Sequence, residues 1–186
     1  SECDFRQLML IHSQMANVYS TMYASQSEEC ELNNALRYAS HIQDRAAMCA
    51  FNDLKCASLY KNKKYYDCIR MTDSLRQVYM QHDDTYNASL VCVNGFKSYL
   101  ALGKYDSAHV YLENYAKIFN TDVSVRNIRG GKDALPILRG DYYLCTNKPD
   151  SALLYYRTVD LHKLIPTVRS YLYCNISTSY KMLSQT

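Results

Sequence analysis

Hydrophobic residues recur every three or four positions along most of the chain, which is the spacing that lines one side of an α-helix. No stretch alternates between hydrophobic and polar residues with a period of two, so the pattern predicts an all-α fold without a sheet. The first two stripes consist of Phe5, Leu8, Met9, Met15, Ala16, Tyr19, Met22 and Tyr23, and then of Leu32, Ala35, Leu36, Ala39 and Ile42. Together they predict a helical hairpin over residues 1–43.

The same spacing continues beyond this hairpin and predicts a series of further helices. They are expected near residues 46–61, 65–80, 85–102, 106–119, 133–145, 150–160 and 166–184. Glycine and proline are scarce, and several of them fall between these ranges or at the start of one, as at Gly103, Pro149 and Pro166. They therefore mark joints between helices.

Comparison of the chain with itself indicates a repeat. In three stretches that align with one another a tyrosine precedes an aspartate by seven residues, and these tyrosines lie 39 and then 44 residues apart. The pairs are Tyr60 and Asp67, Tyr99 and Asp106, and Tyr143 and Asp150. We expect the tyrosine to end a first helix on its buried side and the aspartate to cap the start of a second helix.

On these residues the chain resembles the tetratricopeptide repeat family. The third unit follows the family's order of small residue, tyrosine, small residue and aromatic, at Gly140, Tyr143, Ala152 and Tyr156. The second unit keeps Tyr99, Ala108 and Leu112, and the first keeps Ala57 and Tyr60.

This resemblance implies a right-handed superhelical array of antiparallel helical hairpins, an α-solenoid, over residues 1–186. Within it, 46–80, 85–119 and 133–160 are the recognisable hairpins, and 1–43 is a degenerate first member. The segment 166–184 is the first helix of a further repeat. Its hydrophobic stripe predicts that the chain is an amino-terminal piece of a longer protein, because a terminal repeat needs a polar outer face.

The abundance of tyrosine, 19 in 186 residues, is also similar to tetratricopeptide sensor regions of bacterial membrane-bound regulators. That resemblance implies the sensory part of a larger bacterial regulatory protein in signal transduction. In such proteins the repeats lie outside the cytoplasm, ahead of a membrane helix. A periplasmic or other extracytoplasmic location and a cytoplasmic one both stay open.

Charge and composition narrow the classes of partner. The 21 lysines and arginines against 18 acidic residues give a net charge of +3, and the basic residues are scattered. We therefore expect no nucleic acid to bind this segment, since such binding needs clustered positive charge. No hydrophobic run reaches 18 residues, so no membrane contact is expected either.

The eight cysteines include no C-x-x-C pair, which favours buried free thiols over a disulfide framework or a zinc site.

No catalytic signature appears in the sequence, and the five histidines are dispersed without ligand spacing. We therefore expect no enzyme activity, no cofactor and no metal. A basic, glycine-containing stretch could form an anion-binding nest, although we favour a solvated loop whose glycines absorb a sharp change of direction. It consists of Arg126, Arg129, Gly130, Gly131 and Lys132.

The resemblance implies a concave groove lined by the first helix of each hairpin. The function expected there is a non-enzymatic interaction or scaffolding module that binds a peptide or protein segment; the alternative is a small-molecule sensor. Aligned with the family, the partner-binding residues are Ser58, Lys61, Asn94, Lys97, Asp141, Asn175 and Thr178. Asn94 matches one position of the family's carboxylate clamp, but the full clamp pattern is not present.

Overall fold

The computed structural model describes residues 2–123 and 131–185, which are helical and contain no strand. The elements are α1 (Glu2–Thr21), α2 (Ser25–His41), α3 (Arg45–Lys61), α4 (Tyr65–Gln81), α5 (Thr85–Ala101), α6 (Tyr105–Thr121), α8 (Gly131–Cys145), α9 (Pro149–Tyr156), the 3₁₀ helix η1 (Leu161–Lys163) and α10 (Pro166–Leu183). The predicted all-α fold is confirmed. None of the described helices is both long and apolar enough to span a membrane.

The helices from α2 to α6 follow a strict spacing. Each contains 17 residues. They begin at residues 25, 45, 65, 85 and 105, so a new helix starts every 20 residues. Two consecutive helices and their turns therefore occupy 40 residues.

The turns that precede α2, α3, α4, α5 and α6 close in the same way. Each contains one residue in the left-handed region: Tyr23, Gln43, Lys63, Asp83 and Gly103, with φ between 52° and 68°. The amide of the following residue donates back to the helix that has just ended, as from Lys64 to the Leu59 carbonyl at 2.9 Å. This is the hydrogen bond of a Schellman motif, which stops a helix and reverses the chain.

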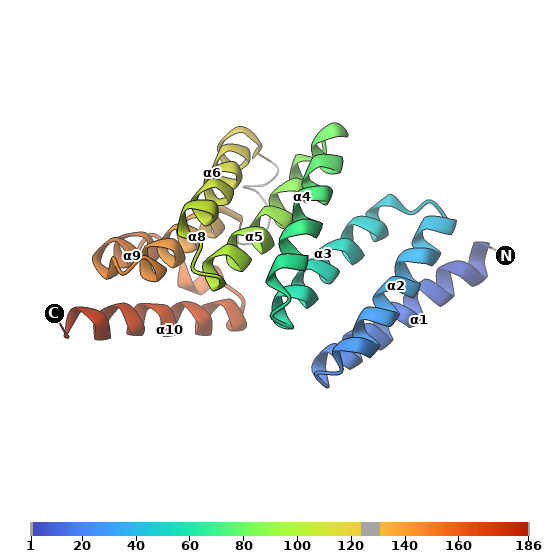
Figure 1. The fold of residues 1–186 in the computed structure, drawn as a ribbon, viewed down its shortest axis with the longest axis horizontal. Helices are drawn as coiled ribbons and strands as arrows, with labels where there is room; N and C mark the ends of the chain where they lie inside the picture. The colour runs from blue at the N-terminus through green and yellow to red at the C-terminus, as the bar shows by residue number, and fades with distance from the viewer. Residues whose placement is uncertain (1, 124–130, 186) are drawn as a thin grey trace.

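Each helix packs against the next along the chain, and a second set of contacts joins alternate helices. Helix α3 contacts α5, α5 contacts α8, and α8 contacts α10. Figure 1 shows the helices following one another from the N-terminus at one end of the molecule to the C-terminus at the other. The first helices of successive hairpins are thus neighbours, although they lie far apart in sequence.

The structure corrects the predicted equivalence of the three tyrosines. Tyr99 and Tyr143 each stand two residues before a helix end, whereas Tyr60 stands one residue before the end of α3. The Tyr99 ring lies 5.3 Å from that of Tyr111, twelve residues on, and Tyr143 lies 5.5 Å from Tyr155, again twelve residues on. Tyr60 instead packs on Tyr65. The predicted equivalence therefore holds for Tyr99 and Tyr143 and is wrong for Tyr60.

Two further expectations are corrected at helix ends. The helices containing Asp67, Asp106 and Asp150 begin one or two residues before the aspartate, with Lys64, Lys104 and Lys148 as their caps. The aspartates lie in the first turn, where their charge still favours the helix dipole. The helix predicted over 150–160 ends at Tyr156 and is followed by η1.

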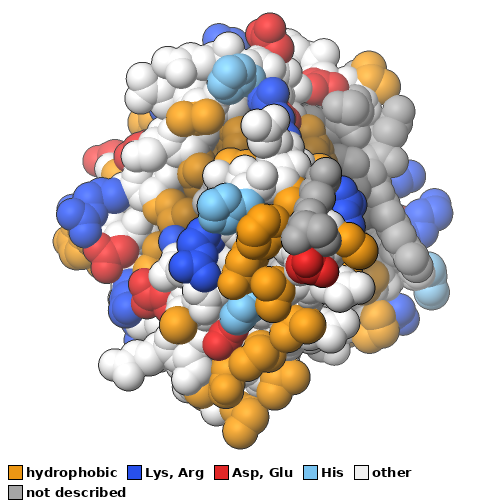
Figure 2. Space-filling model, turned by 90° about the vertical axis from the view of Figure 1, so that its right-hand side faces the viewer, with side chains coloured by type: hydrophobic (Ala, Val, Ile, Leu, Met, Phe, Trp, Pro, Cys, Tyr) orange, Lys and Arg blue, Asp and Glu red, His pale blue; other side chains and the backbone are white. Residues whose placement is uncertain are grey.

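Helix α1 exposes hydrophobic residues at positions that are covered in later hairpins. Ile11 is 50% exposed, whereas Phe51 and Val91, which lie 40 and 80 residues later in the same register, are 6% and 1% exposed. Leu10, Val18 and Met22 are also exposed. Figure 2 faces this N-terminal end of the molecule and shows hydrophobic side chains gathered in a run across it.

Candidate functional site

A groove of about 590 Å³ lies along the first helices of successive hairpins. Its lining comes from α3, α5, α8 and α10, so four segments distant in sequence meet there. Most of the wall is apolar, and it includes Val93, Leu100, Ala134, Ile137, Leu138, Leu144 and Val168. The polar residues of the lining are Tyr60, Lys97, Asp141, Thr167, Tyr171 and Asn175.

Asp141 on α8 is the buried polar centre of this groove. Its Oδ1 accepts hydrogen bonds from the Tyr156 hydroxyl at 2.8 Å and from the Asn175 side-chain amide at 2.9 Å. Its Oδ2 accepts from the Tyr171 hydroxyl at 2.8 Å. The donors stand on α9 and α10, so one carboxylate joins three helices.

Asp141 is buried, and it forms no contact ion pair with the residues that the structure describes. Burial raises the pKa of the Asp141 carboxyl above its ordinary value, although hydrogen bonds from Tyr171 and Tyr156 and the charge of Lys97 oppose that rise. Burial and the nearby carboxylate also raise the pKa of both tyrosines. The two hydroxyls therefore stay protonated and act as donors at neutral pH.

Lys97 is the cation of the groove lining. It is half-buried on α5, and in the described part of the chain its ammonium makes neither a hydrogen bond nor a contact ion pair. Its charge acts at longer range on the carboxylates of Asp53 and Asp141. The donors of Asn175 are used within the protein, whereas those of Lys97 remain available to a ligand.

Asn94 lies beside this groove and has a structural partner. Its side-chain amide donates to Asp53 Oδ1 at 3.0 Å, which links α5 to α3. Burial raises the pKa of the Asp53 carboxyl, against the hydrogen bond from Asn94 and the charge of Lys97. The structure thus brings Asn94, Lys97, Asp141 and Asn175 into one region.

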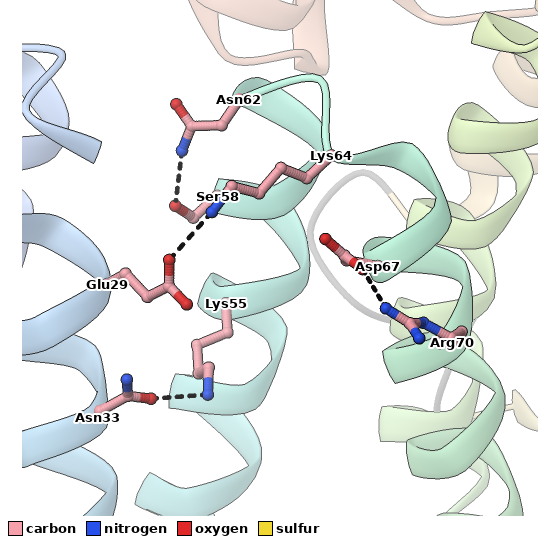
Figure 3. Close-up of polar contacts among 8 residues, drawn as sticks. All are labelled: Glu29, Asn33, Lys55, Ser58, Asn62, Lys64, Asp67 and Arg70. Carbon is pink, nitrogen blue, oxygen red and sulfur yellow. Dashed lines mark hydrogen bonds and ion pairs between the residues drawn. The ribbon is translucent and has the colours of Figure 1, made fainter. Parts of the chain in front are cut away.

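Ser58, Lys61 and Thr178 lie elsewhere. Ser58 is buried and accepts a hydrogen bond from Asn62 at 3.3 Å, beside a smaller pocket between α2, α3 and α4 (Figure 3). Lys61 donates to the Ser20 hydroxyl at 2.9 Å. Thr178 is exposed and donates to the carbonyl of Cys174 in its own helix.

The 40-residue step between α3 and α5 explains why Ser58 and Lys61 miss the groove. A spacing of 39 residues pairs Ser58 with Lys97, but the structural step pairs Ala57 with it. One residue along a helix turns a side chain by about 100°. The same correction replaces Lys61 with Tyr60, which does line the groove, as do its equivalents Leu100 and Leu144.

Tyr171 is the site residue that sequence reasoning assigned to another role. It belongs to the hydrophobic stripe of the last helix and therefore suggested packing rather than binding. Its spacing of four residues from Asn175 places both side chains on one face of α10, which is the signal that connects them.

Other candidate chemistry is sparse in the described structure. Among residues 2–123 and 131–185, no group of three or more histidine, cysteine, aspartate or glutamate side chains could hold a metal ion. Arg126, Arg129 and Gly130 of the predicted anion nest lie outside the described residues. Comparisons with family models, curated proteins and solved structures found no significant match.

Proposed function

We propose that the chain is a non-enzymatic interaction module, built as a tetratricopeptide-like α-solenoid, whose groove takes a peptide or protein segment. The observation that carries this proposal is the groove formed by α3, α5, α8 and α10, with an apolar wall and a lysine, Lys97, that has no hydrogen bond or contact ion pair among the described residues. The regular hairpins and the contacts between alternate helices support the solenoid part. The 40-residue hairpin exceeds the family's length of about 34 residues because its helices are longer.

The polar groups left unused in the groove match those of a peptide. Lys97 offers donors, and the side-chain oxygen of Asn175 accepts no hydrogen bond in the described structure. A peptide backbone supplies both a carbonyl acceptor and an amide donor. Its apolar side chains would cover residues such as Ile137 and Leu144, which supplies the hydrophobic contribution to affinity.

A displayed random-peptide library panned on the native chain tests this proposal. Binding of enriched peptides would then be measured by fluorescence polarisation. Lys97→Ala, which removes the unpaired cation, should weaken binding by about tenfold, the effect of 1.4 kcal/mol. Thr167→Arg, which places a long side chain at the exposed edge of the groove, should weaken it further.

Lys117→Ala is the matched control, because Lys117 is exposed on α6 and does not line the groove. It should leave affinity unchanged. Enriched peptides that bind all three variants equally well would place the binding surface elsewhere and refute the proposal.

A small-molecule sensor is the second candidate, and the size of the groove favours it. Its volume of about 590 Å³ lies within the range of roughly 300–1,000 Å³ usual for small-molecule sites. A thermal-shift screen of small carboxylates and amides distinguishes the two, since a ligand that binds the folded state raises the unfolding midpoint. A shift that Lys97→Ala abolishes would favour the sensor. Either ligand suits the sensory part of a bacterial regulatory protein.

A further inference from the structure

The eight cysteines, all free thiols, divide into two groups by exposure. Cys3, Cys30, Cys145 and Cys174 are exposed, and Cys49, Cys56, Cys68 and Cys92 are buried. The expectation of buried thiols therefore holds for half of them. Two of the buried thiols, Cys56 and Cys68, lie together.

Cys56 on α3 and Cys68 on α4 face each other across one hairpin. Both have 0% exposure. The Cys68 thiol donates to the Cys56 carbonyl oxygen at 3.3 Å, and the two side chains are close enough for each to shift the pKa of the other. The helix register places Cys68 in the same position as Ala108 and Ala152, so a small side chain suits this position in all three hairpins.

Two buried hydroxyls lie beside this pair. The hydroxyls of Thr72 and Ser98 lie close enough to the Cys68 sulfur to affect its pKa, and neither has a hydrogen-bond partner in the described structure. Buried donors of this kind normally have an acceptor. A thiolate at Cys68 would provide one for both hydroxyls.

The same neighbours give the two thiols different acidities. The side chains of Cys56, Ser98 and Thr72 favour the thiolate form and lower the pKa of the Cys68 thiol against the effect of burial. The interaction with Cys68 and burial raise the pKa of Cys56. Cys68 is thus the better nucleophile, because thiolates are the reactive form.

We propose that Cys56 and Cys68 are a redox modification site, at which hydrogen peroxide forms an intramolecular disulfide that joins α3 to α4. The Cys68 thiolate attacks one peroxide oxygen and the O–O bond breaks. This gives a sulfenic acid and a hydroxide, which takes up the proton lost by Cys68 and leaves as water. The Cys56 sulfur then attacks the Cys68 sulfur, and the S–O bond breaks as the S–S bond forms.

The second step releases the sulfenic hydroxyl as water with the Cys56 proton. Overall two thiols lose two electrons and two protons, and one peroxide becomes two waters. Because both sulfurs are fully buried, the oxidant must be small or must enter when the hairpin opens locally.

The two other buried cysteines lack this arrangement. Burial raises the pKa of Cys92 to about 11, which leaves little thiolate at neutral pH. Cys49 packs in a cluster with Tyr79, Ala88, Val91 and Ile118, which contains no second cysteine. We therefore expect oxidation of the buried thiols to be selective for the Cys56 and Cys68 pair.

The test uses the full chain with the four exposed cysteines changed to serine, so that only the buried thiols can react. The folded protein is treated with hydrogen peroxide, and the remaining thiols are then alkylated in denaturant. Trypsin cuts at Lys61, Lys63 and Lys64, so a disulfide appears in mass spectrometry as two linked peptides. We expect two of the four remaining thiols to disappear and dithiothreitol to restore both.

Single cysteine substitutions show which thiol reacts in each of the two oxidation steps. Cys56→Ala should leave a sulfenic acid at Cys68 that dimedone traps. Cys68→Ala, which places alanine where the other hairpins carry it, should fold and lose none of the three remaining thiols. Cys92→Ala is the matched control and should keep the disulfide. Linked peptides that form only after denaturation, or oxidation at Cys49 and Cys92 as fast as at the pair, would overturn the proposal.

Discussion

Gly140 and Tyr156 are in such close contact that a Cβ on residue 140 would lie 2.2 Å from a ring carbon of the tyrosine. Tyr156 has 1% exposure and its hydroxyl donates to Asp141, so the ring has no room to move. The glycine therefore sets the distance between α8 and α9. Through Tyr156 it also sets the position of the carboxylate in the groove.

Gly140→Ala should destabilise the fold by about 3 kcal/mol or more, the upper range for adding a methyl group to a packed core. Urea unfolding followed by circular dichroism measures the loss. Gly103→Ala is the control, since a Cβ there meets nothing within 4 Å and only the positive φ of 68° opposes it. That control should cost about 1 kcal/mol. Equal losses for both variants would contradict the role of the Tyr156 contact.

The turns predict a stabilising change. Lys63 occupies the position of Gly103 with a φ of 60°, and it is exposed. Lys63→Gly should therefore stabilise the protein by about 0.5 kcal/mol, because relief of left-handed strain exceeds the entropy that glycine adds to the unfolded chain. Differential scanning calorimetry should record a midpoint about 1–2 °C higher. A lower midpoint would show that the Lys63 side chain has a role of its own.

The helices were predictable because hydrophobic spacing and helix formation depend on the same local geometry. The register between hairpins was not predictable, because the chain contains many tyrosines and Tyr60 lies one residue from the position that aligns with Tyr99. That single step moved two groove assignments, to Ser58 and Lys61, onto other faces of α3. Asp141 was found because the predicted alignment of Tyr143 with Tyr99 agrees with the structural register of α5 and α8. The Cys56 and Cys68 pair was hidden, since contacts across a hairpin follow from packing and no short motif encodes them.

The exposed stripe of α1 predicts unequal costs at equivalent positions. Phe51→Ala should destabilise the protein by about 3–5 kcal/mol, because Phe51 is buried in the core. Ile11→Ala, in the same register of α1, should change stability by less than about 1 kcal/mol, because Ile11 is already half exposed. Chemical denaturation of the two variants compares them directly. A large loss for Ile11→Ala would mean that this face is covered in solution.

Asp141 predicts how stability depends on pH. Its carboxyl has a raised pKa in the folded state, so the folded protein holds this proton more tightly than the unfolded chain does. Its contribution to stability is therefore greatest in acid, and it declines as pH rises from the unfolded pKa to the folded one. The slope is at most about 1.4 kcal/mol per pH unit, the limit for one proton.

Tyr171→Phe tests this contribution with little change in packing, since it removes only the hydroxyl that donates to Asp141. That hydrogen bond opposes the rise in the pKa of Asp141, so its loss should extend the pH range of the decline upward. Stability should fall by about 1.5–3 kcal/mol at neutral pH, and by less in acid, where Asp141 is protonated. Urea unfolding across a pH series measures both effects. Tyr173→Phe, an exposed change in the same helix, should alter neither, and a loss from Tyr171→Phe that is constant with pH would exclude Asp141 as the titrating group.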